Sequence, residues 1–156
     1  MTNDELNSRG SAATICHASL VIEVSAALIF RGEKLLITQR HAKAHLGGRW
    51  EFPGGKREAG ETFEQCLTRE IREELGVEIA VGELFEEISQ TYPEKSVHLK
   101  FFLCKLVAGE PQPLDCAAVK WIEKTGLDAH EFPAADERVL EKLKRARHLW
   151  QGKQQA

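Results

Sequence analysis

The sequence predicts an α+β fold in which a mixed β-sheet is layered with a small number of helices. Apolar runs rich in β-branched residues recur along the chain with turn residues between them, which is typical of strands joined by hairpins. Two other segments show the apolar spacing of amphipathic helices. The length of 156 residues suits one domain, so we expect a disordered tail at 1–15 and a single domain at 16–152.

The composition is that of an ordinary globular protein, with 42% hydrophobic and 29% charged residues. The net charge of -3 gives no electrostatic reason to expect a stable nucleic-acid partner. The four cysteines are scattered and match no zinc-binding spacing, which favours reduced thiols. The N-terminus lacks the pattern of a signal peptide, and no apolar stretch is long enough to span a bilayer. We therefore expect a cytoplasmic protein without a membrane partner.

The first strands are expected to form a hairpin. Leu20–Phe30 is rich in Val, Ile, Leu and Ala and is predicted as a buried strand. Leu35–Gln39 returns as a second strand after a polar turn. A polar loop that ends in two glycines follows. Trp50–Phe52 is predicted as a short extended piece, because Pro53 favours extended backbone in the residue before it.

A helix is predicted between Thr62 and Gly76. Thr62 and Gln65 have the spacing of a capping box, in which each side chain accepts a hydrogen bond from the other residue's backbone N–H. Gly76 provides the C-terminal stop, since glycine readily adopts the left-handed conformation found there. The apolar residues of this helix are Phe63, Cys66, Leu67, Ile71 and Leu75.

The second half of the chain is predicted to return to strands and to end in another helix. The expected strands are Val77–Val81, Leu84–Thr91, Ser96–Leu106 and Ala118–Ile122. The second helix is expected from Pro133 to about Gln151, with apolar side chains on one face and basic side chains on the other. That basic face favours a solvated surface over contact with nucleic acid.

Three glutamates on the first helix do not fit a purely structural role. Glu70, Glu73 and Glu74 stand at i, i+3 and i+4, so they project from one side of the helix. Glu70 and Glu74 fall inside the apolar arc, where burial of a carboxylate is costly unless a cation compensates it. All three lie toward the C-terminal end, where the helix dipole disfavours negative charge. A charge run alone would more often be a solvated face paired with Arg69 and Arg72.

A glycine-rich loop precedes this helix. Gly54, Gly55 and Gly60 allow the backbone to approach a ligand closely. Mg²⁺ binds proteins through one or two carboxylates together with substrate phosphates. The loop and the acids of the helix together indicate a site for a metal ion and a phosphate group.

The loop and the helix also resemble the complete Nudix box. Its defining positions are filled, with their spacing intact, by Gly55, Glu61, Arg69, Glu70, Glu73, Glu74 and Gly76. The resemblance runs from about Ile22 to Leu143 and is closest to the MutT-type 8-oxo-dGTP diphosphatases. It implies a Nudix α/β/α sandwich with a mixed sheet. It also implies Mg²⁺-dependent hydrolysis of a nucleoside triphosphate to a monophosphate and pyrophosphate, with Mn²⁺ as an alternative metal. We expect a monomer or a dimer.

The resemblance assigns roles by position. The implied catalytic residues are Glu61, Arg69, Glu70, Glu73 and Glu74, with Glu70 favoured as the base. The implied metal ligands are the backbone carbonyl of Gly54, the side chains of Glu70, Glu73 and Glu74, and Asp115. The implied substrate-binding residues are Arg40, Glu51, Phe52, Lys56, Lys95 and Asp136.

Two acids depart from the family pattern. Asp136 stands where many MutT-type enzymes have an asparagine, which can match both the N7–H donor and the O6 acceptor of 8-oxoguanine. An ionised aspartate would instead suit the exocyclic amine of cytosine or adenine, unless an apolar pocket retains its proton. A simple helix-capping role for Asp136 is a further alternative. Asp115 replaces a glutamate that serves as a metal ligand in the family, and its side chain is one methylene shorter.

Four functional interpretations follow. The first is a pyrophosphohydrolase of oxidised nucleoside triphosphates such as 8-oxo-dGTP, and the second is a related enzyme that prefers pyrimidine triphosphates such as CTP or dCTP. The third is a non-catalytic nucleotide sensor, which would be expected to lose an acid of the box. The fourth is an enzyme acting on RNA ends, which the lack of basic excess disfavours.

Overall fold

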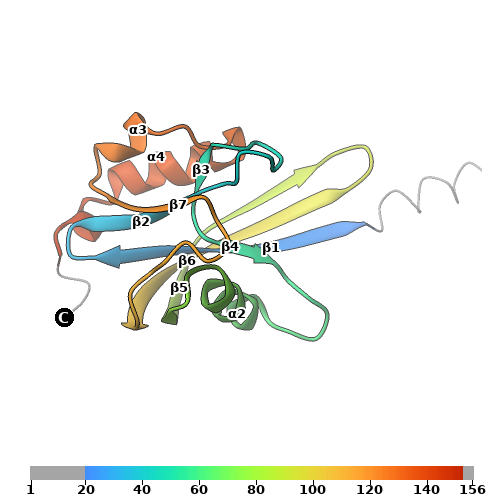
Figure 1. Cartoon of the computed structure of the whole chain (residues 1–156). Helices are drawn as coiled ribbons and strands as arrows, with labels where there is room; N and C mark the ends of the chain where they lie inside the picture. Colours follow the sequence, from blue (N-terminus) through green and yellow to red (C-terminus); the bar gives the residue numbers. More distant parts are fainter. Residues whose placement is uncertain (1–19, 153–156) are drawn as a thin grey trace, which may run out of the picture.

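The computed structural model describes residues 20–152, in which one mixed sheet lies between helices on its two faces (Figure 1). The strands are β1 (Val21–Arg31), β2 (Lys34–Gln39), β3 (Trp50–Glu51), β4 (Gly54–Lys56), β5 (Glu78–Thr91), β6 (Ser96–Ala108) and β7 (Ala118–Ile122). The helices are α2 (Phe63–Leu75), α3 (Gly126–Ala129) and α4 (Glu137–Arg145), with 3-10 helices η1 (Ala134–Asp136) and η2 (Arg147–Trp150). The predicted α+β fold with a mixed sheet is confirmed.

The centre of the sheet is a parallel pair formed by β1 and β6. The main path through the sheet is β3-β2-β1-β6-β5, while β4 pairs with β1 and β7 pairs with β2. The register places Val24–Ala26 of β1 between Leu99–Phe101 of β6 and Gly54–Lys56 of β4. Three segments far apart in the sequence therefore form one floor in the middle of the sheet.

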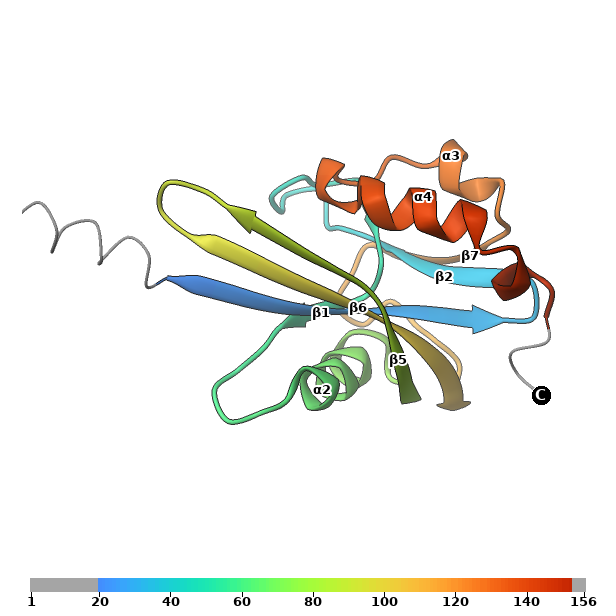
Figure 2. The same ribbon diagram turned by 180° about the vertical axis from the view of Figure 1, so that it is seen from behind.

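Helix α2 covers one face of the sheet and α4 covers the other (Figure 2). Successive side chains of β1 therefore enter different cores. Ala27 and Ile29 pack on the side of α2, whereas Leu28 and Phe30 pack on the side of α4. A strand buried on both faces is continuously apolar, which explains the apolar run Ala26–Phe30 within β1.

The ends of α2 agree with the prediction. The capping box is formed, because Thr62 Oγ1 accepts from the Gln65 N–H at 3.0 Å and Gln65 Oε1 accepts from the Thr62 N–H at 2.8 Å. Gly76 ends the helix in the left-handed region with φ 71°. The last carbonyls are not left open, since Glu74 O accepts from the N–H groups of Leu114 and Asp115 at 3.0 and 3.2 Å. The loop before β7 is thereby held against the C-terminal end of α2.

The prediction of one long C-terminal helix was wrong. The segment is divided into η1, α4 and η2, and the break after α4 falls at Ala146, whose ψ is 68°. The chain turns there so that Trp150 can pack edge-on against Phe30 and donate from Nε1 to Leu143 O at 2.9 Å. The free energy gained by burying Trp150 exceeds the free energy that a further turn of this highly charged helix would add.

Two strand predictions also needed correction. The separate strands expected before the hairpin turn are one strand, β5, which contains a register irregularity between Val81 and Leu84. A Cβ at Gly82 would lie 2.7 Å from Leu103 O, so a glycine allows the strand to continue through the bulge. The glycine loop contains a short strand, β4, because Gly54 has no Cβ to collide with Ser25 O.

Some expectations fall outside the described residues. The boundary between a tail at 1–15 and a domain at 16–152 lies in the part of the chain that precedes residue 20. In the described range of 20–152, no helix is both long enough and apolar enough to cross a membrane.

Candidate active site

A cavity of about 330 Å³ opens over the floor formed by β1, β4 and β6. Six of the predicted site residues line it, namely Arg40, Glu51, Phe52, Gly54, Lys56 and Asp136. The remaining lining residues are Val24, Ser25, Ala26, Gly55, Leu99, Phe101, Pro133 and Ala135. The other predicted site residues do not line this cavity: Glu61, Arg69, Glu70, Glu73, Glu74, Lys95 and Asp115. Lys95 lies in the turn between β5 and β6, whereas Glu70 lies behind the glycine segment, against Gly55. The cavity therefore joins the glycine segment to η1.

The three glutamates of α2 differ in exposure. Glu74 is buried, with 9% of its surface exposed, whereas the Glu73 side chain is 59% exposed. Glu70 lies between these two, with its side chain 22% exposed. A Cβ at Gly55 would lie 2.2 Å from Cδ of Glu70, so the Glu70 carboxylate rests directly on the glycine backbone. The absence of a side chain at Gly55 thus provides the space that Glu70 occupies.

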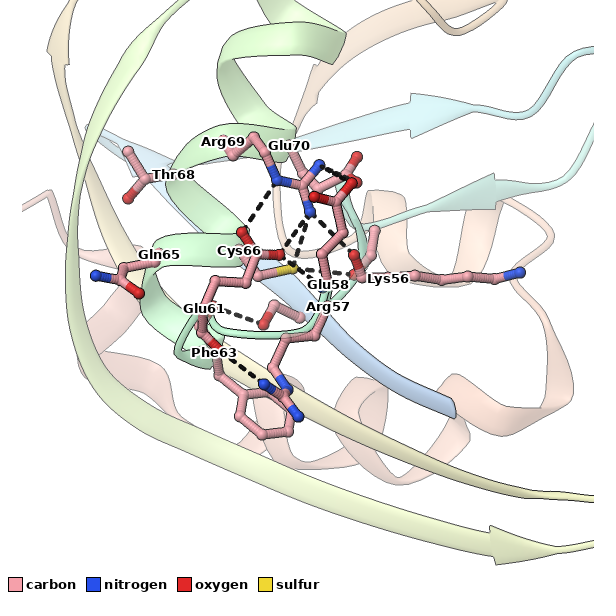
Figure 3. Close-up of polar contacts among 12 residues, drawn as sticks. Lys56, Arg57, Glu58, Glu61, Phe63, Gln65, Cys66, Thr68, Arg69 and Glu70 are labelled. Carbon is pink, nitrogen blue, oxygen red and sulfur yellow. Dashed lines mark hydrogen bonds and ion pairs between the residues drawn. The ribbon is translucent and has the colours of Figure 1, made fainter. Parts of the chain in front are cut away.

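Arg69 connects the loop to the helix (Figure 3). Its Nη2 and Nε donate to the two carboxylate oxygens of Glu61 at 2.7 and 3.1 Å, and its Nη1 donates to Glu70 Oε1 at 2.9 Å. The Arg69 Nη2 also donates to the Lys56 carbonyl at 3.1 Å. The guanidinium of Arg69 and the Glu58 N–H lower the pKa of Glu61 to about 2. The Arg69 guanidinium, held by Glu61, in turn holds the Glu70 carboxylate in one orientation.

Burial shifts the ionisation of the helix acids. It is the main cause that raises the pKa of Glu74 to about 8, and the nearby negative charges of Glu51 and Glu70 raise it further. Burial also raises the pKa of Glu70, although Arg69 opposes that change. Crowded, desolvated carboxylates of this kind gain stability from a cation, and their hard oxygens suit Mg²⁺.

The side chains of α2 fit a divalent metal that the substrate helps to hold. Across residues 20–152 there is no ready-made cluster of three or more His, Cys, Asp or Glu side chains in metal-binding geometry. Mg²⁺ needs no such cage, because it keeps several waters and takes phosphate oxygens as ligands. The donors present at this site therefore match Mg²⁺ bound together with a polyphosphate.

The other end of the cavity is apolar and contains one acid. Phe52 stacks on Phe132 with ring centroids 5.3 Å apart. Asp136 is 6% exposed, and within the described part of the chain its carboxyl makes no hydrogen bond or ion pair. Burial, followed by the charge of Glu51, raises its pKa to about 7. Asp136 makes no side-chain capping bond to α4, so the capping interpretation was wrong.

Two of the residues that line the cavity, Arg40 and Glu51, form an ion pair. Arg40 Nη1 and Glu51 Oε1 are 2.9 Å apart, and Arg40 Nε donates to His45 O at 2.7 Å. Glu51 raises the pKa of both Glu74 and Asp136. Its carboxylate therefore lies close enough to act on both of these acids.

Asp115 is placed less clearly for metal binding. Its backbone N–H donates to Glu74 O, which brings this residue to the end of α2. Its side chain is nonetheless 83% exposed, with the carboxylate 3.6 Å from His41 Nε2. A contact between the Asp115 carboxylate and a metal held by Glu74 would require a change of rotamer.

Several residues of the cavity had no predicted functional role. Val24 and Ala26 of β1 and Leu99 and Phe101 of β6 were expected as strand residues alone. Their shared position depends on the parallel pairing of β1 with β6, which no local pattern reveals. Thr38 was also unassigned, although a polar residue inside the apolar β2 is visible in the sequence.

Comparison with known proteins identifies the family of this chain. The family model described as NUDIX domain matches residues 25–142, so the chain belongs to the Nudix family. Among individual proteins, it is 41% identical to an 8-oxo-dGTP diphosphatase of Escherichia coli K12, over 75% of this chain and 92% of that protein. It is 37% identical to a CTP pyrophosphohydrolase of the same strain, over 74% and 84% of the two chains.

Solved structures show the same fold. The solution structure of the E. coli ORF135 protein matches with a TM-score of 0.71 and 35% identity, covering 82% of this chain and 91% of that one. A MutT structure from work on Aliivibrio salmonicida and Vibrio cholerae matches with a TM-score of 0.69 and 29% identity, covering 80% and 96%. The Nudix sandwich implied by the sequence motif is thereby confirmed.

Proposed function

We propose that this protein is a Mg²⁺-dependent nucleoside triphosphate pyrophosphohydrolase of the MutT type, with 8-oxo-dGTP as its preferred substrate. One arrangement supports this function: the cavity is lined at the glycine segment by Gly54 and Gly55, against which Glu70 of α2 packs, and elsewhere by apolar side chains and the buried acid Asp136. The first of these regions suits phosphates and a metal ion, and the second suits a base. The 41% identity to an 8-oxo-dGTP diphosphatase supports the same conclusion.

The acids and the glycine segment would hold the metal. Glu70, Glu73, Glu74 and the carbonyl of Gly54 are the proposed ligands, and Asp115 would join them after a rotamer change. Mg²⁺, with Mn²⁺ as an alternative, would neutralise charge on the phosphate oxygens and favour ionisation of the attacking water. Lys56, which lines the cavity, would contact the polyphosphate.

The reaction would then use the residues held by Arg69. Glu70, oriented by Arg69, would accept the proton of the water that attacks phosphorus. The bond from that phosphorus to the pyrophosphate group would break, leaving a nucleoside monophosphate. Glu61 would act indirectly, by fixing the guanidinium that orients Glu70.

Asp136 supports an oxidised guanine as the base. A carboxyl that keeps its proton both donates and accepts, as an asparagine does, so it can pair with N7–H and O6 of 8-oxoguanine. Burial of Asp136 favours this neutral form near pH 7. Phe52 would pack on the base, and the ion pair of Arg40 with Glu51 would border the base and the sugar.

A pyrimidine triphosphate is the second candidate substrate. With a pKa of about 7, Asp136 is also ionised in part at neutral pH, and the ionised form would accept from the exocyclic amine of cytosine. The relative described as a CTP pyrophosphohydrolase supports this alternative. A silent nucleotide sensor is disfavoured because every acid of the box is present.

The proposal includes a cytoplasmic location, where nucleotides are abundant and thiols stay reduced. Cys66, Cys104 and Cys116 are free and buried, in agreement with that setting. A stable nucleic-acid partner and a membrane partner are not part of the proposal, and the protein would act as a monomer or a dimer.

A substrate panel tests the function. We expect 8-oxo-dGTP to have the highest kcat/KM among canonical and oxidised triphosphates, with dCTP and CTP next. The products should be a monophosphate and pyrophosphate in equal amounts. Release of orthophosphate in place of pyrophosphate would rule out the proposed reaction.

A further inference from the structure

Thr38 is a buried residue whose hydroxyl is unpaired. It lies in β2 with 0% of its surface exposed. Its Oγ1 has no hydrogen-bond partner anywhere in residues 20–152. Buried polar atoms in native proteins almost always have a partner, and leaving one without a partner costs free energy. The hydroxyl therefore calls for an explanation other than folding alone.

Packing of the strand does not provide that explanation. Thr38 lies opposite Val119 in β7 and Glu51 in β3, and it follows the buried apolar residues of β2. A valine has nearly the same shape and an equal preference for strands, and it would bury no hydroxyl. Position 38 thus holds a hydroxyl group where the methyl group of a valine would pack at least as well.

The neighbours of Thr38 are the acids of the active site. Residues two apart in a strand share a face, so Thr38 lies on the same side as Leu36, which packs in the core under α2. Glu74 is a buried residue of α2, the helix that covers this side of the sheet. The Thr38 hydroxyl is among the groups that lower the pKa of the Glu74 carboxyl, although it forms no hydrogen bond within residues 20–152. Glu51, directly opposite Thr38, is the second acid in reach of this face.

Glu74 is also the helix acid that lacks a cationic partner. Arg69 forms ion pairs with both Glu70 and Glu73. Among the described residues Glu74 forms none, although it is the most buried of the three. An ionised carboxylate offers about four lone-pair positions, and a metal ion occupies one or two of them. The Gly54 N–H, which lowers the pKa of Glu74, can serve one of the remaining positions, and the Thr38 hydroxyl can serve another.

We propose that Thr38 is a positioning residue, whose hydroxyl donates to the Glu74 carboxylate when that carboxylate binds Mg²⁺. This inference rests on the proposed function, because it requires Mg²⁺ at Glu74. The hydroxyl would fix the rotamer of Glu74 and so increase the affinity for the metal. It would have its partner in the metal-bound enzyme and lack one in the metal-free enzyme.

The test compares Thr38→Val with Thr38→Ser in the full-length protein. Thermal melting is followed across a Mg²⁺ titration without nucleotide, and kcat is measured at saturating substrate. Thr38→Val should melt at the same or a higher temperature than wild type without Mg²⁺. It should need roughly ten-fold more Mg²⁺ for half of the thermal shift and lose roughly ten-fold in kcat, as for one lost bond to a charged group. Thr38→Ser should stay within about three-fold of wild type in both.

Two further variants separate the outcomes. Thr68→Val removes a threonine hydroxyl from α2 that bonds only to the Glu64 carbonyl, and it should leave the Mg²⁺ dependence unchanged. In a Glu74→Gln background, Thr38→Val should cause no additional loss of kcat. An unchanged Mg²⁺ midpoint and kcat in Thr38→Val, or full additivity with Glu74→Gln, would overturn the inference while leaving the proposed function intact. A wild type with neither a Mg²⁺-dependent thermal shift nor activity would overturn both.

Discussion

At the scale of single residues, Asp136 is an acid kept away from both water and cations. Burial disfavours its charged form, and the carboxylate of Glu51 adds a like charge nearby. Its pKa of about 7 means that small changes of pH convert it between a group that donates and one that only accepts. Recognition of the base should therefore depend on pH.

The ionisation of Asp136 should be visible in stability. Its pKa rises from 3.8 to about 7 on folding, so the folded protein holds a proton that the unfolded chain releases. The stabilisation from this bound proton is complete at a pH below the pKa of the unfolded chain, and it is lost as the pH rises through the pKa of the folded protein. Between pH 5 and pH 8, the free energy of unfolding of wild type should therefore fall by about 2 kcal/mol relative to that of Asp136→Asn, since one pKa unit corresponds to about 1.4 kcal/mol. Urea unfolding without metal at both pH values measures this, and parallel pH profiles would contradict it.

The same residue should control base preference. In wild type, the ratio of kcat/KM for 8-oxo-dGTP to that for dCTP should fall between pH 6 and pH 8, as the carboxyl loses its donor. In Asp136→Asn the ratio should stay high across this range, because an amide keeps both functions. One lost hydrogen bond to the base is worth roughly ten-fold or more in this ratio. A variant that loses stability with every substrate ratio unchanged would move base recognition to Arg40 and Phe52.

Glu73 offers a clean test of the metal site, because its side chain is 59% exposed and contributes little to the core. Glu73→Gln should leave the melting temperature of the metal-free protein within a degree or two of wild type. It should lower kcat/KM by more than about 100-fold, since even the loss of a residue that only hydrogen-bonds to a metal ligand lowers metal affinity or activity by about 10–100-fold. Glu64→Gln, an exposed change on the same helix, is the control. Activity within a few-fold of wild type in Glu73→Gln would remove this residue from the catalytic set.

At the scale of elements, α2 and β4 act as one unit. The helix supplies the acids, and the short strand supplies a backbone with no Cβ where Glu70 lies. Arg69 ties the two together through Glu61, Glu70 and the Lys56 carbonyl. The orientation of the Glu70 carboxylate thus depends on contacts across this pair and not on the helix alone.

Gly55→Ala tests this contact between elements. The new Cβ would lie 2.2 Å from the Cδ of Glu70, so the carboxylate must move. Since a displacement of about 1 Å can cost about 100-fold in rate, we expect a loss of that order in kcat. Gly32→Ala is a matched control, because its φ of 61° introduces strain but no atom lies within 4 Å of the new Cβ. The control should lower stability and preserve kcat; equal kcat in both variants would show that Glu70 tolerates the shift.

At the scale of the whole molecule, the sheet separates two cores, so the proposed sites for the phosphates and for the base belong to different layers. The core under α2 supports the acids, whereas the core under α4 supports Phe52, Phe132 and Asp136. The parallel pair of β1 and β6 lies between them and forms the floor of the cavity. Repulsion among the crowded carboxylates should therefore lower the free energy of unfolding of the whole protein.

Mg²⁺ should therefore stabilise the whole protein. Binding at 100 times its Kd adds about 2.7 kcal/mol to the free energy of unfolding. For a domain of this size that corresponds to a rise of several degrees in melting temperature. Melting in millimolar MgCl₂, compared with KCl at the same ionic strength, separates binding from screening of surface charge. Equal melting temperatures in the two salts would argue against a metal site formed by these acids.

Local chemistry explains why parts of the structure could be predicted from the sequence. Thr62, Gln65 and Gly76 bracket α2 through bonds made within a few residues, so its bounds followed from the sequence. Spacing along one helix likewise placed Glu70, Glu73 and Glu74 together. The strands of the hairpins were found by their apolar runs, because burial on one or both faces leaves a direct pattern in the chain.

Properties that depend on distant segments were decided by the tertiary structure. The C-terminal helix is broken because Trp150 reaches Phe30, and β4 exists because Gly54 lies against Ser25. Both contacts join residues that are far apart in the sequence. The ionisation of Asp136 and the unpaired hydroxyl of Thr38 likewise follow from what other elements place around them. Sequence by itself determined which chemical groups this protein has and which of them share a helix. Only the folded chain determined their burial and their neighbours, because desolvation and charge interactions act through space and not along the chain.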